Sequence, residues 1–223
     1  ALLAECLAGH DPEDAATRLR ARPRWSQTAA AEPPLPPTLA WVPTPMWSRL
    51  DGDAREAFDE LVALLGGRIA PFELPEGVAG VIDAHRAVME ADLATSYEDE
   101  WTRGRSHLSS SLQAQLERGR QVTARDYRRA LERIPVLNAA FDGIFDHYDA
   151  LVTPATLGTA LAGLDGTGDP VMCTLWTFTG QPAISLPLLH GANGLPLGVQ
   201  LVGRRDDDGR LLRTARWLTR QVA

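Results

Sequence analysis

The chain has 223 residues, of which 44% are hydrophobic and 23% charged, a composition ordinary for a globular protein with a substantial core. Its formal net charge of −7 argues against nucleic acid and anionic membranes as partners, because both bind basic patches. No apolar run approaches the roughly 18 residues of a membrane span, and the N-terminus does not predict a signal peptide. All 22 basic residues are arginine, so the sequence contains no lysine.

The start of the chain indicates that it belongs to something longer. Residues 1–8 have a helical pattern ended by Gly9, and no capping residue precedes them. A helix of about eight residues is marginal on its own, so we expect a longer protein to complete it. The isolated cysteines Cys6 and Cys173 suit a reducing compartment and predict a cytoplasmic protein, although a disulfide between them stays open.

The first third predicts a loop-rich lead-in followed by a strand, a helix and a second strand. Residues 1–38 end in a proline-rich connector that blocks helix formation. Residues 39–42 form a short apolar run, residues 51–65 have helical spacing of apolar side chains, and residues 68–72 form a second strand candidate. We place this unit at residues 39–76; it favours a parallel arrangement of its two strands.

Residues 77–148 are predicted to be helical. The pattern indicates one or two helices over residues 78–102 and another over residues 107–118. Thr123 is a good N-cap for a long amphipathic helix, which Pro135 should kink or split.

Residues 149–223 predict strands and a closing helix. A buried strand over residues 149–154 precedes a glycine-rich loop and a short helix over residues 171–179. Strands follow over residues 183–188 and 197–202, and the acidic run at residues 206–208 suits the start of a final helix.

No catalytic residue stands out from the spacing of the polar residues. The serines at positions 109–111 lie on a predicted helix and fit a solvated face, and Ser185 lies inside a strand. No GxSxG turn is present, and the five histidines have no spacing typical of a catalytic triad.

Neither a metal nor a cofactor is predicted. Asp83 with His85, or Asp146 with His147 and Asp149, place ligand types close together without a recognised metal-binding spacing. The glycines near residue 166 lack the pattern of a dinucleotide site.

Four features of the sequence form a recognisable set. They are LLAECLAGHDPEDAAT at the start, the general layout of residues 39–148, HYDALVTPAT from His147, and GQPAISLP with GLPLGVQLVG near the end. Together they resemble the amidase signature family, whose members hydrolyse amides with two serines and a lysine. The last pair is the most specific, and all four occur in the family order. The resemblance implies an α/β fold with a mixed sheet flanked by helices.

The resemblance also implies hydrolysis of carboxylic amides through a serine acyl-enzyme. The serines, the lysine and the glycine- and serine-rich segment of the family have no counterpart here. We therefore expect this chain to be the C-terminal half of an amidase domain, inactive alone and partnered by the missing N-terminal half, with a homo-oligomer also possible. The alternatives are a non-catalytic amidase-like binding or assembly module and the amidase-like subunit of a tRNA-dependent amidotransferase.

The residues that precede the Gly-x-Pro turn line the acyl site in the resembled family. In this sequence they are Cys173, Thr174, Trp176 and Thr177, which are our candidate substrate-binding residues. An aromatic ring with small polar groups is a common pocket lining. The sequence does not distinguish a pocket role for Trp176 from packing in the core.

Overall fold

The computed structural model describes residues 1–14, 17–163 and 166–222, which fall into two compact units. Unit 1 comprises Ala1–Leu74, Asp142–Met172 and Gly180–Ala223; unit 2 comprises Pro75–Phe141 and Cys173–Thr179. Within the described ranges, every helix is too short or too polar to cross a membrane.

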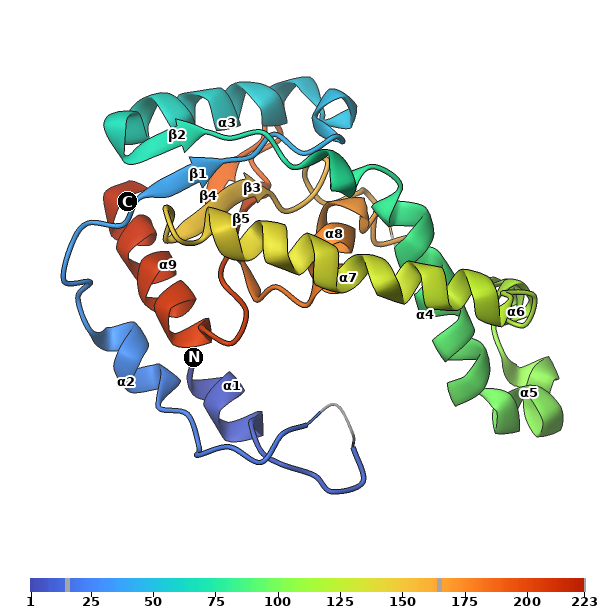
Figure 1. The fold of residues 1–223 in the computed structure, drawn as a ribbon. Helices are drawn as coiled ribbons and strands as arrows, with labels where there is room; N and C mark the ends of the chain where they lie inside the picture. Colours follow the sequence, from blue (N-terminus) through green and yellow to red (C-terminus); the bar gives the residue numbers. More distant parts are fainter. Residues whose placement is uncertain (15–16, 164–165, 223) are drawn as a thin grey trace. The chain divides into compact units, whose positions relative to one another are not determined.

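Unit 1 is built on a five-stranded mixed sheet in the order β2-β1-β3-β5-β4 (Figure 1). β1 pairs in parallel with β2 and β3, whereas β5 runs antiparallel to β3 and β4. The predicted mixed sheet is thus confirmed, including the parallel pair joined by a helix. The strand bounds are Leu39–Trp41 (β1), Ile69–Pro71 (β2), Ala150–Pro154 (β3), Ala183–His190 (β4) and Pro196–Val202 (β5).

Two amphipathic helices pack on one face of this sheet. They are α3 (Gly52–Leu65) and α9 (Asp208–Val222), both at predicted positions. Phe58 of α3 and Leu218 of α9 belong to the same apolar cluster as Leu39 and Val152 of the strands. Burial of such side chains contributes about 1.5–3 kcal/mol each, so this cluster is a major source of the stability of unit 1.

Two short helices precede the sheet in unit 1. They are α1 (Leu2–Leu7) and α2 (Trp25–Ala30), and α2 packs against α9. The helix α2 lies in the segment that we predicted to be loop-rich, and the sequence pattern did not indicate it. Short 3₁₀ turns lie at Trp47–Arg49 (η1) and Gly66–Arg68 (η2).

Unit 2 is helical, as its sequence predicts. Its elements are η3 (Glu76–Val78), α4 (Val81–Ser96), α5 (Glu98–Gly104), η4 (Arg105–His107) and α6 (Ser110–Gly119). It also contains most of α7 (Ala124–Ile144) and of α8 (Val171–Thr179). Thr123 caps α7, since its hydroxyl accepts the backbone N–H of Asp126 at 3.1 Å. The helix α7 continues past Pro135 instead of splitting there.

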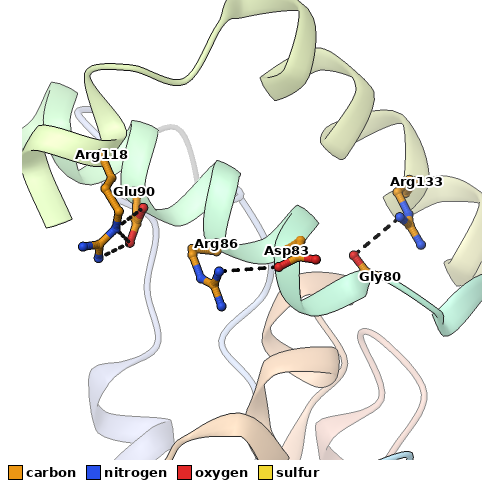
Figure 2. A network of polar contacts seen from close by, with 6 residues as sticks. All are labelled: Gly80, Asp83, Arg86, Glu90, Arg118 and Arg133. Carbon is orange, nitrogen blue, oxygen red and sulfur yellow. Dashed lines mark hydrogen bonds and ion pairs between the residues drawn. The ribbon is translucent and has the colours of Figure 1, made fainter.

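An ion pair between an exposed arginine and a buried glutamate joins α4 to α6. Figure 2 shows Glu90 of α4 facing Arg118 of α6. The Glu90 side chain is only 5% exposed, and Arg118 Nε lies 3.0 and 3.1 Å from its two carboxylate oxygens. Arg133 of α7 donates to the backbone oxygen of Gly77 at 2.9 Å and so ties the turn before α4 to α7. These contacts hold α4 in place against α6 and α7.

Candidate functional site

Unit 1 has a cavity of about 640 Å³ beside the ends of the parallel strands β1 and β3; we name it the sheet-edge cavity. Open α/β sheets commonly bind ligands outside the carboxyl ends of their parallel strands. The sheet-edge cavity is lined by three groups of residues. They are residues 155–161 and 167–169 after β3, Arg49 and Asp51 after β1, and Ser185, Pro187, Pro196 and Gly198 of β4 and β5.

A charged pair lies in the lining of the sheet-edge cavity. Arg49 Nη2 lies 2.6 Å from Asp169 Oδ2, and both side chains are nearly half exposed. The other oxygen of Asp169 accepts the backbone N–H of Val171 at 2.9 Å, at the first residue of α8. The hydrogen bond from Arg49, aided by that N–H, holds the pKa of Asp169 below its ordinary value. The cavity therefore presents a guanidinium and an ionised carboxylate to polar groups of a ligand.

Two glycines allow the chain to close around this cavity. A Cβ on Gly158 would lie 1.9 Å from Asp51 Oδ2, and a Cβ on Gly198 would lie 2.6 Å from Ser185 Oγ. Asp51 also donates its backbone N–H to the carbonyl of Leu157 at 2.9 Å. The loop after β3 is thus held against the start of α3 by contacts that a larger side chain would break.

The four candidate substrate-binding residues lie on α8, in unit 2. Cys173 and Thr177 are exposed one helical turn apart, and Thr174 is half-buried beside them. Trp176 is 2% exposed, and its ring centroid lies 5.6 Å from that of Phe141 in an edge-on contact. The structure therefore brings Cys173 and Thr177 to one surface and places Trp176 in the packed interior of the unit. Substrate binding by these residues stays a prediction.

Two of the serines noted in the sequence lie on regular elements of the fold, Ser109 before α6 and Ser185 on β4. Ser109 caps α6 by accepting the N–H of Leu112 at 3.3 Å, which is a structural role. Ser185 lines the sheet-edge cavity, but among the described residues no hydrogen bond links it to a histidine.

The two candidate ligand sets for a metal do not converge. Asp83 faces Arg86 at 3.5 Å (Figure 2), whereas the His85 ring lies 6.4 Å from the Phe178 ring. Asp149 accepts from Arg210 Nε at 2.9 Å. Over the described ranges, no three His, Cys, Asp or Glu side chains form a group that could hold a metal ion.

Sequence reasoning missed Arg49 and Asp169, which are 120 residues apart in the chain. It also missed Met89, and it considered His85 only as a metal ligand or a triad histidine; both line a second cavity, of about 350 Å³, with Thr177 in unit 2. A carboxylate just before a proline and an apolar run signals a helix start, which could have singled out Asp169. Nothing in the sequence pairs it with Arg49, because that contact depends on the sheet topology.

Comparison with known proteins places these features in a family. A family model described as Amidase matches residues 1–212. A glutamyl-tRNA(Gln) amidotransferase subunit from Brevibacillus brevis is 36% identical over 96 residues, which cover 40% of this chain and 20% of that protein. The corresponding subunit from Desulforamulus reducens is 40% identical over 96 residues, with the same coverage of both chains.

Solved structures share the fold at low sequence identity. A 6-aminohexanoate cyclic dimer hydrolase has a TM-score of 0.77 and 20% identity, covering 99% of this chain and 52% of that one. A bacterial aryl acylamidase has a TM-score of 0.73 and 17% identity, covering 96% and 49%. The chain thus spans about half the length of these enzymes. Since the family match extends over nearly the whole sequence, the chain belongs to the amidase family, as its motifs predicted.

Proposed function

We propose that this chain supplies the C-terminal part of an enzyme that hydrolyses linear carboxylic amides through a serine acyl-enzyme. The family match over residues 1–212 carries the reaction class. The absence of lysine supports the proposal that the catalytic groups lie outside this chain, because the chemistry that the resemblance implies needs a lysine as general base. The nucleophile, the base and the oxyanion-binding segment then come from the missing N-terminal half, in a cytoplasmic enzyme.

In this proposal the chain provides substrate-binding walls. Within unit 1, the sheet-edge cavity offers a cation and an anion, Arg49 and Asp169, to a polar ligand. On α8, Cys173, Thr174 and Thr177 contact the acyl group, while Trp176 holds the helix against Phe141. Binding energy of this kind accelerates the reaction only as far as it positions the amide for attack.

Co-expression tests the proposal. Co-expressed with an N-terminal amidase half that carries the lysine, this chain should yield a complex that releases ammonia from amides and is labelled on one serine by a phosphonate. Arg49→Gln in that complex should raise KM for polar amides more than for apolar ones, with Arg55→Gln as a control at an exposed position on α3. A complex that carries both halves, folds and neither hydrolyses amides nor reacts with the phosphonate would refute it.

A second candidate is the amidase-like component of a tRNA-dependent amidotransferase, which the 36–40% identity to such components favours. The formal net charge of −7 of this chain weighs against contact with tRNA. Ammonia delivered to a partner protein, with little release into solution, would distinguish it from a free hydrolase. A non-catalytic binding module would give neither ammonia nor serine labelling.

A further inference from the structure

The exposed side of α4 forms a groove in unit 2 with residues of α7 and α8; we name it the α4 groove. Along α4 its wall includes His85, Met89 and Leu93, which follow one another at intervals of four residues. Ile134 of α7 and Phe178 of α8 complete the apolar lining, and the volume is about 350 Å³. Side chains at this helical spacing share one face, so the groove is a continuous strip of apolar surface.

The polar groups of the α4 groove include a carboxylate and an imidazole. Asp92 is the carboxylate among the described lining residues; it is exposed, and one of its oxygens accepts the hydroxyl of Tyr127 at 2.8 Å. The half-buried His85 ring packs edge-on against Phe178, and burial lowers the pKa of this imidazole. The imidazole is therefore neutral near pH 7. A neutral hydrogen-bonding ring beside an aromatic floor suits an uncharged ligand.

We propose that the α4 groove binds an uncharged phenyl group of the amide substrate, with Met89 and His85 as residues that determine specificity. The inference rests on the proposed function, because it takes the ligand to be an amide. Thr177, a candidate substrate-binding residue, lies in the same groove and connects it to the predicted acyl site.

The size of the groove fits this occupant. An engineered apolar cavity of roughly 150 Å³ in another protein binds benzene, so 350 Å³ accommodates a substituted phenyl ring. Met89 is 37% exposed, and its flexible thioether can close over such a ring, since sulfur–aromatic contacts are favourable. An anionic group is disfavoured here, because it would be repelled by the Asp92 carboxylate in the lining.

Methionine-methyl NMR tests the binding directly. The chain has three methionines, and Met46 and Met172 lie in unit 1. The 223-residue chain labelled on its methionine methyl groups is titrated with benzamide and, separately, with acetamide. We expect benzamide to shift the Met89 signal in a saturable way while the other two stay in place, and acetamide to leave all three unchanged. Equal shifts of the three signals with benzamide, or an unmoved Met89, would overturn the inference.

Substitutions sharpen this test. Met89→Gln keeps the length of the side chain but makes it polar, and benzamide should bind about tenfold more weakly, which is the low end of the effect of one apolar contact in a pocket. With the Met89 signal lost in that variant, the Phe178 ring signals report binding. His85→Arg places a permanent cation in the groove and should weaken benzamide binding to a similar extent. Val136→Thr, at a site on α7 that is 69% exposed and outside the groove, should leave the affinity unchanged.

Turnover separates this inference from the proposed function. In the complex of both halves, Met89→Gln should lower kcat/KM for benzamide about tenfold and leave that for acetamide unchanged. An equal loss for both amides would overturn the assignment of Met89 to specificity. Absence of any hydrolysis, with the Met89 shift by benzamide intact, would count against the proposed function and leave the groove as a binding site for apolar amides.

Discussion

Gly119→Ala is a demanding test of how unit 2 holds α4 in place. Gly119 is the last residue of α6 and lies where this helix crosses α4. A Cβ there would lie 1.9 Å from the backbone oxygen of Glu90 and 3.0 Å from the Cβ of Ala94. The first contact is with backbone, so no rotamer change can relieve it. The two helices must move apart, which also strains the ion pair between Glu90 and Arg118.

The expected loss of stability follows from opposing terms. Overpacking of a well-packed contact costs about 1–3 kcal/mol. Replacing glycine by alanine inside a helix gains about 1 kcal/mol at most, and less at the last residue. A backbone clash this close should cost about 3 kcal/mol, the upper end of the overpacking range. After the helix-propensity gain is subtracted, the net loss in the free energy of unfolding is about 2 kcal/mol, which for a chain of this size lowers Tm by about 4–8 °C.

Thermal unfolding followed by circular dichroism measures this shift. The matched control is Gly143→Ala in α7, where a Cβ meets no atom within 4 Å and Tm should rise slightly. Hydrogen exchange should also show faster opening of the α4 amides in Gly119→Ala. If Gly119→Ala melts at or above the wild-type temperature while Gly143→Ala behaves as expected, the close crossing of α4 and α6 is refuted.

Three further predictions address chemistry and the interior of unit 2. The 223-residue chain alone should not hydrolyse amides, because it has no lysine; steady ammonia release would contradict this. Trp176→Ala should destabilise the protein by about 3–5 kcal/mol because the ring is buried against Phe141; a variant with unchanged urea midpoint and altered substrate ranking would instead show direct substrate contact. Because burial lowers the pKa of His85, the unfolded chain binds this proton more readily, so stability should fall as the pH drops below about 6.5. His85→Gln should reduce the difference in urea midpoint between about pH 7.5 and about pH 5.5, and an unchanged difference would contradict the assignment.

Much of the fold follows from local sequence patterns. The segments that begin near Leu39 and Pro196 are short and rich in apolar residues, and turn residues flank them. Both form strands in the structure. The helix Val171–Thr179 has the predicted bounds. Its short apolar run is flanked by Pro170 and Gly180, which mark its limits.

What the sequence did not reveal depends on tertiary contacts. The helix α2 has only six residues and packs on α9, so its formation is decided by a distant partner and not by its own periodicity. Likewise, the pairing of Arg49 with Asp169 follows from the ends of β1 and β3 lying at one edge of the sheet. The sequence does not decide whether Trp176 is buried, because an aromatic residue on a short helix suits a core and a pocket equally well.

The strand order of the sheet has a consequence for how the chain folds. The central strand β3 joins β1 in parallel, and the backbone N–H of Thr38 just before β1 bonds to the carboxylate of Asp149, 111 residues later. The β4–β5 hairpin closes locally, yet it is the last part of the sheet to be synthesised. During translation β1 and β2 can pair early, but β1 cannot pair with β3 until residues 150–154 have left the ribosome. Folding dominated by such distant pairings is slow, so chaperone dependence and a late, abrupt gain of protease resistance should mark the biosynthesis of this protein.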